Sequence, residues 1–211
     1  MPSFETLLAF LGISLVITFA PGPDNLMVLG QSLARGWRAG LGIALGCALG
    51  CVTHITWAVL GVAAALMSSP RAFLALKLAG AAWLLWLGIK ALRSGGAPGA
   101  PLATPAEPWL RYLRRGFIAN ALNPKVALFF LAFLPQFVEP ARGGVAGQLL
   151  TLGLVFALQT VFVFGGIAIA SGYIGRSLGK HPAAGPWLER LCGMIFIGLA
   201  ARLLADGLPR Q

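Results

Sequence analysis

The chain has 211 residues, of which 58% are hydrophobic and 10% charged, and its mean hydropathy is +0.83. Soluble domains carry roughly 25% charged residues, so this composition excludes a water-soluble protein. The net charge of +10 would suit nucleic acid, but the basic residues cluster in loops between apolar runs, where they usually set membrane orientation. We therefore expect a multi-pass helical protein that sits in a lipid bilayer and binds no nucleic acid.

Six apolar stretches approach the roughly 20 residues that a helix needs to cross the hydrocarbon core. The N-terminal "MPSFETLLAF" has no Lys or Arg, so it lacks the basic region of a cleavable signal peptide, and we expect it to remain in the mature protein. The second and fifth stretches are rich in small residues, which let membrane helices pack closely and would allow a homodimer. The predicted spans are residues 4–27, 40–66, 71–92, 116–138, 147–172 and 187–205.

Helix-breaking residues interrupt the first and fourth spans. The first span contains "PGPDN" at residues 21–25, and the fourth contains "NALNPK" at residues 120–125. Proline removes a backbone donor and clashes with the preceding turn. Inside a bilayer such backbone is satisfied only where it borders protein or a watery cavity. Each break would therefore expose free carbonyls and the N-terminus of a half-helix.

Two similar segments indicate an internal repeat. "KLAGAAWLLWLGIKALRSG" at residues 77–95 resembles "RLCGMIFIGLAARLLADG" at residues 190–207, although chance similarity between apolar segments is an alternative. A repeat of three spans must enter the membrane in opposite orientations, and matching broken helices in such repeats point to a transporter binding site. We predict two inverted three-helix halves, residues 1–92 and 116–211, joined by a Pro/Gly-rich loop at residues 93–115.

The distribution of Lys and Arg predicts the orientation. Ten of these residues fall on the side of the long central loop and five on the other. Because cytoplasmic loops carry the excess of positive charge, loop 93–115 should be cytoplasmic and both termini should be periplasmic.

The two breaks carry opposite charges at equivalent positions, Asp24 and Lys125. Ionised residues within a span are costly and are normally paired or functional. The N-terminus of a half-helix attracts a carboxylate, and free carbonyls and amide oxygens accept from an ammonium group. Asp24 would contact the substrate ammonium or a coupling proton, and Lys125 the substrate carboxylate or Asp24 itself. The alternative is that both residues cap helix ends in headgroup water. The candidate binding residues are Pro21, Gly22, Pro23, Asp24, Asn25, Asn120, Asn123, Pro124 and Lys125.

Polar residues deep in other spans have two interpretations each. His54 would either relay protons beside Asp24 or donate to a neighbouring helix as a neutral ring. Gln159 would line the same cavity or bridge helices, and bridging is favoured for Thr53 and Thr56. Cys47 and Cys51 lie four residues apart on one helical face, which is typical of small packing residues; a redox pair is the alternative.

The sequence contains no enzyme signature. It has no metal-ligand spacing, no phosphate-binding glycine loop and no set of residues typical of nucleophilic catalysis. We predict a protein that is not an enzyme and that has no metal or cofactor.

The ordered motifs resemble one known family. "FAPGPDNLMVLGQSLARGWRAGLGIALG", "LKLAGAAWLLWLGIKALRSG" and "RRGFIANALNPKVALFFLAFLPQFV" are similar to the LysE/RhtB family of bacterial amino-acid exporters, especially its threonine/homoserine branch. The resemblance implies an inner-membrane efflux carrier driven by the proton-motive force, with the site at both break motifs. The superfamily is thought to include thiol–disulfide carriers with cysteines at the breaks, where this chain has none.

The predicted function is therefore export of a small neutral amino acid or derivative, such as threonine, homoserine or homoserine lactone, by proton antiport. The alternatives are export of another small hydrophilic metabolite, a membrane thiol–disulfide electron carrier using Cys47 and Cys51, and a structural membrane subunit.

Overall fold

The computed structural model describes residues 1–62, 70–93, 107–180 and 184–205. All regular structure within these ranges is helical, which confirms the predicted all-α class. Besides α-helices, η1 and η2 are π-helical turns, and η3 and η4 are 3-10 turns. The elements are α1 (Phe4–Phe19), α2 (Pro23–Arg35), α3 (Trp37–Trp57), η1 (Ala58–Val62), α5 (Pro70–Arg93), α6 (Trp109–Ala121), α7 (Pro124–Leu128), η2 (Phe129–Phe133), η3 (Leu134–Phe137), η4 (Pro140–Arg142), α8 (Val145–Lys180) and α9 (Ala184–Ala205).

Two continuous helical segments of the described chain are long and apolar enough to cross a membrane. They are Trp37–Gly61 and Val145–Ile174, and two bent helix pairs would bring the number of spans to four. Helices α5 and α9 lie where the third and sixth spans are predicted. The arrangement of six spans in two inverted halves stays a prediction.

Several helices extend beyond the predicted spans. Helix α6 begins at Trp109, before the predicted start at residue 116, and α8 continues to Lys180, beyond residue 172. The difference arises because hydropathy marks only the apolar part of a helix. Backbone hydrogen bonding continues through the polar flanks.

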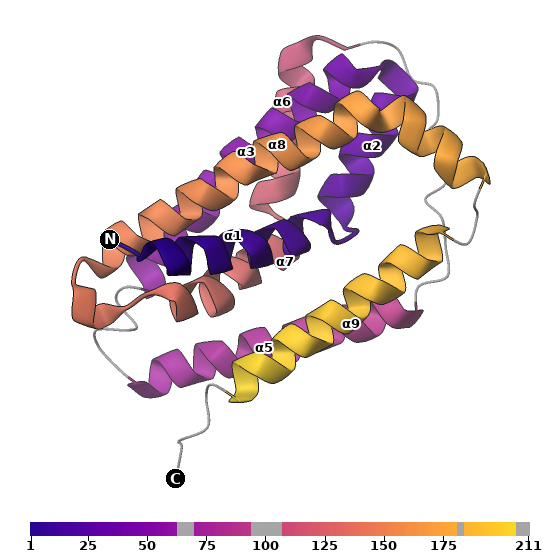
Figure 1. Ribbon diagram of the computed structural model, residues 1–211. Coiled ribbons are helices and arrows are strands. Elements are labelled where there is room, and N and C mark those ends of the chain that lie inside the picture. The colour runs from indigo at the N-terminus through magenta and orange to yellow at the C-terminus, as the bar shows by residue number, and fades with distance from the viewer. Residues whose placement is uncertain (63–69, 94–106, 181–183, 206–211) are drawn as a thin grey trace.

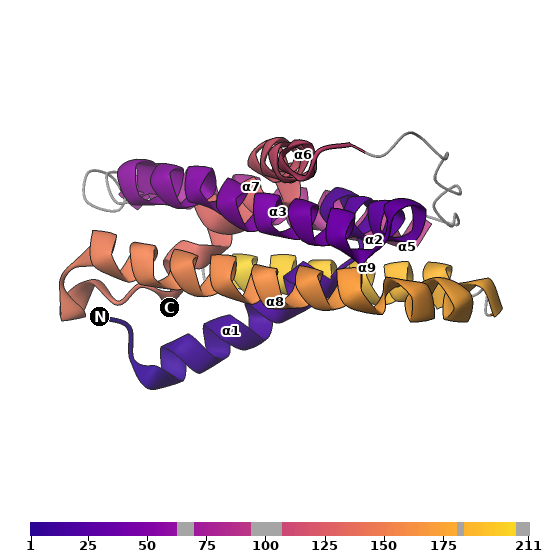
Figure 2. The same ribbon diagram turned by 90° about the horizontal axis from the view of Figure 1, so that it is seen from above.

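Helices α3 and α8 run side by side through the larger part of the molecule, and α6 packs across α3 (Figures 1 and 2). Glycines permit the close approach of α3 and α6. A Cβ at Gly46 would overlap the carbonyl oxygen of Leu113, and a Cβ at Gly116 would overlap that of Ile43. Small residues at such crossings are typical of membrane helices.

Helices α5 and α9 form a second, two-helix unit beside the larger bundle (Figure 1). Here too the backbones nearly touch. A Cβ at Gly88 would lie 2.8 Å from the carbonyl oxygen of Gly193, and a Cβ at Gly193 would lie 2.7 Å from that of Gly88. The two segments in which the sequence suggests a repeat therefore pack against each other.

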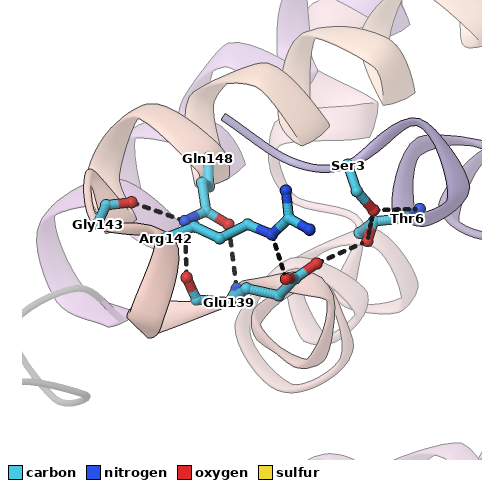
Figure 3. A network of polar contacts seen from close by, with 6 residues as sticks. All are labelled: Ser3, Thr6, Glu139, Arg142, Gly143 and Gln148. Carbon is cyan, nitrogen blue, oxygen red and sulfur yellow. Dashed lines mark hydrogen bonds and ion pairs between the residues drawn. The ribbon is translucent and has the colours of Figure 1, made fainter.

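The N-terminal end of α1 is fixed to the loop before α8 by a polar network (Figure 3). Thr6 Oγ1 donates to Glu139 Oε1 at 3.0 Å, and Arg142 Nε forms an ion pair with the other Glu139 oxygen. Gln148 accepts from the Glu139 backbone N–H at 3.0 Å. This end of α1 is thus held by side chains near the surface, whereas its other end lies in the interior.

Candidate functional site

The first break separates α1 from α2. The chain bends by 59° between Phe4–Phe19 and Pro23–Arg35. Gly22 is the N-cap of α2 in an extended conformation, and no side chain caps the helix. Pro23 occupies the first turn, where its missing N–H would have no intrahelical partner in any case. The prolines therefore do what the sequence predicts: they end one helix and start another.

The second break separates α6 from α7. The bend between Trp109–Ala121 and Pro124–Phe137 is 48°. Asn123 is the N-cap, and its Oδ1 accepts from the Lys125 backbone N–H at 3.0 Å. Such a side chain satisfies one of the free donors at a helix start. The second break thus carries its own cap, unlike the first.

Lys125 connects the second break to the first. Its ammonium donates to the carbonyl oxygens of Ile17 at 3.2 Å and Ala20 at 2.9 Å. These carbonyls belong to the C-terminal end of α1, which carries negative partial charge and favours a cation. Only 6% of the Lys125 surface is exposed, so the site holds a buried positive charge.

Asp24 provides the opposite charge on the other side of the junction. It is 1% exposed and lies in the first turn of α2, where the helix dipole favours an anion. Its Oδ2 accepts from Asn120 Nδ2 at 2.8 Å. Asn25 donates back to the Thr18 carbonyl at 2.7 Å. Both asparagines therefore hold the breaks in place through their amide groups.

Asp24 and Lys125 line one small cavity together. Its volume is about 10 Å³, which is roughly the space that one water molecule needs. Besides these two charges, its lining comprises Ile17, Thr18, Asn120, Val126, Phe156, Thr160 and Phe164. The structure thus places the two charged residues predicted from the sequence at one small cavity.

A larger cavity of about 530 Å³ lies where the two breaks meet the α5–α9 unit. Lys125 lines this cavity as well as the small one. Its volume is in the range of small-ligand pockets. The break residues lining it are Pro21, Gly22, Pro23, Asn123, Pro124 and Lys125, with Leu26 of α2. The α5–α9 unit contributes Trp83, Trp86, Leu87, Lys90, Ala91 and Phe196. The first set is the predicted one, but Asp24, Asn25 and Asn120 lie outside this lining.

The α5 and α9 residues were missed by the sequence reasoning. The motif "KLAGAAWLLWLG" indicates the family resemblance and one half of a repeat, but by itself it does not predict a cavity wall. Two tryptophans within one apolar span are the signal that would have indicated a binding wall, because aromatic side chains dominate ligand pockets.

His54 contacts the second break from α3. Its Nε2 lies 2.9 Å from the Asn120 carbonyl oxygen, and since a carbonyl only accepts, Nε2 carries the proton. The ring packs on Phe130 at 5.7 Å between centroids. This geometry is that of a histidine donating to a neighbouring helix. It also connects His54 through Asn120 to Asp24.

Of the other polar residues, Gln159 bridges helices, whereas Thr53 and Thr56 form no such bridge within the described residues. Gln159 Nε2 of α8 donates to Thr18 Oγ1 of α1 at 2.7 Å. Thr53 and Thr56 instead donate to carbonyls of their own helix, at 2.7 and 2.8 Å. The prediction that they bridge helices is therefore wrong. A hydroxyl that reaches back to its own helix satisfies itself without a partner helix.

Cys47 and Cys51 are free thiols buried completely within α3. Cys51 Sγ donates to the Cys47 carbonyl at 3.4 Å. Among the described residues, no group of three or more His, Cys, Asp or Glu side chains is placed to hold a metal ion.

An aromatic cluster separates the polar junction from the N-terminal end of α1. Phe156, which lines the small cavity, stacks at 5.1 Å on Phe129, which lies 5.5 Å from Phe133 between ring centroids. Phe133 and Phe137 line a further cavity of about 350 Å³ beside Thr6 and Glu139. Contiguous rings therefore fill the interior between the two ends.

A helical membrane protein with broken helices around a buried pair of opposite charges is built as a carrier. The comparison with known proteins agrees: residues 15–207 match the family model of the LysE type translocator. The chain belongs to this family, whose members are transporters and not enzymes.

Several curated relatives cover nearly the whole chain. A homoserine/homoserine lactone efflux protein of Salmonella typhimurium is 30% identical over 97% of this chain and 98% of its own length. A leucine efflux protein of Enterobacter sp. (strain 638) is 30% identical over 89% of each chain. An uncharacterized membrane protein of Vibrio cholerae is 31% identical over 90% of this chain and 92% of its own. No solved structure matches the chain.

Proposed function

We propose that the protein exports a small neutral amino acid or a close derivative across the bacterial inner membrane, by antiport with protons. The observation that carries this proposal is the junction of the two breaks. There Lys125 lines both the cavity of about 530 Å³ and the small cavity that Asp24 also lines. A zwitterion needs both charges within reach, and an amino acid is the simplest zwitterion. Relatives named as leucine and homoserine efflux proteins support this substrate class.

The charge of the large cavity favours neutral substrates over basic ones. Its described lining includes Lys90 and Lys125 and no acidic residue. A cationic substrate side chain would meet like charges there without a compensating carboxylate. An uncharged side chain would instead rest on Trp83, Leu87 and Phe196.

Proton coupling would use Asp24 and the residues that connect to it. Asn120 joins Asp24 to His54 through two hydrogen bonds, at 2.8 and 2.9 Å. Protonation of Asp24 would remove the negative charge beside Lys125. It would thereby weaken the electrostatic contacts between the first and the second break.

The proposed transport cycle alternates access between the two ends of the molecule. The large cavity reaches Lys90 near the C-terminal end of α5, on the side where the basic residues predict the cytoplasm. The aromatic cluster and the Thr6–Glu139 contact would close the opposite, periplasmic end. Six spans in two inverted halves, with both termini periplasmic, form part of this proposal.

Counterflow into proteoliposomes tests the proposal. Liposomes that contain the purified protein and are loaded with unlabelled leucine, homoserine or threonine should take up the same labelled amino acid from outside. An imposed pH gradient should drive its accumulation. Lysine should not exchange. Absence of exchange for every neutral amino acid, with and without the gradient, would refute the export function.

A further inference from the structure

Two residues that line the large cavity each carry a buried hydrogen-bond donor that has no partner within the described part of the chain. The donors are Trp83 Nε1 on α5 and Asn123 Nδ2 at the second break, and both residues line the cavity of about 530 Å³. The other unpartnered buried side-chain atoms in the described part of the chain are oxygens, which are acceptors. The unpartnered donors are therefore gathered at a single cavity.

The chemistry of these donors restricts what can satisfy them. A buried donor without a partner destabilises a fold, so its presence in a native structure calls for a reason. The indole N–H only donates. Asn123 Oδ1 already accepts from the Lys125 backbone N–H at 3.0 Å, which fixes the amide and leaves its nitrogen as the available group. Since no acceptor among the described residues reaches either nitrogen, a bound molecule could supply one.

The charges around the cavity indicate an anionic acceptor. Lys90 and Lys125 both line it, and among the described residues no Asp or Glu does. The Lys90 ammonium lies 5.1 Å from the Trp86 ring centroid, so its charge is held at the cavity wall. A planar carboxylate accepts from several donors at once, which matches one indole, one amide and one ammonium.

We propose that Trp83 and Asn123 bind the carboxylate of the exported substrate, and that Trp83 is a specificity-determining residue of this carrier. The inference rests on the proposed export function and narrows its substrate class. Substrates with a free carboxylate should bind better than amides, esters or lactones of the same side chain. An open-chain amino acid should therefore be preferred over its lactone.

Ligand binding to the purified full-length chain in detergent tests this assignment. The ligands are leucine, leucinamide and 4-methylpentanoate, which keeps the carboxylate and lacks the ammonium. The wild type should bind leucine at least about tenfold more tightly than leucinamide, the factor expected from one hydrogen bond to a charged group. Trp83→Phe, which keeps an aromatic wall but removes the N–H, should abolish most of this preference.

Trp86→Phe is the matched control. Trp86 lines the same cavity on the same helix, but it is 48% exposed and its nitrogen is not among the unpartnered buried atoms. This variant should keep the ratio of leucine to leucinamide affinity even where both affinities fall. A thermal unfolding curve of each ligand-free variant separates binding from folding. Because the Trp83 and Trp86 rings are in contact at 4.6 Å between centroids, either variant can lose some stability. Only Trp83→Phe should also lose the affinity ratio, whereas a purely structural tryptophan would lower the stability and leave the ratio intact.

Asn123→Asp provides a second variant should Trp83→Phe not fold. The aspartate keeps the oxygen that caps α7 and replaces the donor nitrogen by an anionic oxygen. It should weaken 4-methylpentanoate binding at least about tenfold, because a donor to the carboxylate becomes a like charge.

Unchanged carboxylate preference in Asn123→Asp and in a folded Trp83→Phe would overturn the inference, as would a wild type that binds neither leucine nor 4-methylpentanoate. A wild type that binds 4-methylpentanoate in a Trp83-dependent manner, but exchanges no amino acid in proteoliposomes, would support the carboxylate site and refute amino-acid export.

Discussion

The two helix breaks look alike in sequence but are stabilised differently. The second break is capped from within, by Asn123 on the Lys125 backbone N–H. The first has no side-chain cap at Gly22, and it is held by residues of the second break. Lys125 binds the end of α1, and Asn120 binds Asp24 at the start of α2. The second break is therefore the support, and the first break depends on it.

This dependence gives the two breaks different roles. A segment held by another element is released when that element's side chains find other partners. A substrate carboxylate beside Lys125 would compete with the α1 carbonyls for the ammonium. Substrate binding at the second break would thus loosen the first, which couples occupancy to the geometry of α1.

The largest expected effect is from Lys125→Met. The variant removes both hydrogen bonds to α1 and leaves Asp24 without the opposite charge that lines the same cavity. Each hydrogen bond to a charged group contributes roughly 1.5–3 kcal/mol, so the free energy of unfolding should fall by about 3 kcal/mol or more. Transport should be lost. Titration with denaturing detergent measures the first quantity and counterflow the second. Lys125→Arg, which keeps the charge, should be less destabilised, and a Met variant of wild-type stability would contradict the support role.

A smaller effect is expected from Asn120→Leu. Asp24 Oδ2 would lose its donor while remaining buried, at a cost of about 1–3 kcal/mol. Transport should fall because the orientation of Asp24 is no longer fixed. The matched control is Asn25→Leu, which removes a hydrogen bond within the first break, to the Thr18 carbonyl. Equal loss of transport in both variants would show that the hydrogen bond between the breaks matters no more than the one within the first break.

Removal of the cap tests the second break alone. Asn123→Ala should lower the free energy of unfolding by about 1 kcal/mol, the usual contribution of an N-cap side chain. Asn123→Asp retains the capping oxygen and should keep most of the stability. Denaturing-detergent titration of the two variants side by side measures the difference. If both variants lost the same free energy of unfolding, the capping oxygen of Asn123 would not be what stabilises the second break.

The smallest effect is expected at the other end of α1, which provides a reference for an exposed network. Hydrogen bonds from Arg142 and then Thr6 lower the pKa of the Glu139 carboxyl. A lowered pKa means that the stabilisation is present above the ordinary Glu value of about 4.3 and is lost as pH falls through the lowered value. The protection of backbone amides at the start of α1, after correction for the intrinsic pH dependence of exchange, should therefore stay constant from neutral to mildly acidic pH and fall below it. In Glu139→Gln this acid-dependent loss of protection should be absent, and its persistence would assign the loss to another group.

Much of the fold follows from local sequence. Apolar stretches located the helices, and the prolines located both breaks, because a missing backbone donor acts at the residue itself. The side-chain partners were less accessible. Thr53 and Thr56 were expected to bridge helices and instead bond to their own, because the sequence does not reveal which face of a helix a neighbour covers.

The sequence indicates the break residues of the candidate site but not the residues that α5 and α9 contribute to the cavity lining. The polar residues at the breaks are conspicuous because charge within an apolar span is costly. Trp83 and Trp86 carry only the signal of two tryptophans within one apolar span, and Phe196 is an ordinary residue for a membrane helix. Their role depends on how α5 and α9 pack beside the breaks, which is a property of the tertiary structure.

The glycine contact between α5 and α9 has a consequence for how such a carrier changes its substrate over evolution. Gly88 and Gly193 bring these two helices into backbone contact, so part of their pairing does not depend on the side chains that reach the cavity. Replacement of a half-buried position such as Leu87 would leave this glycine contact in place, whereas Phe196 also belongs to the buried core. The charged residues of the breaks, Asp24 and Lys125, belong to other helices and would keep their positions. In the proposed mechanism, residues of the α5–α9 unit that line the cavity could therefore change with the substrate while Asp24 and Lys125 stay the same.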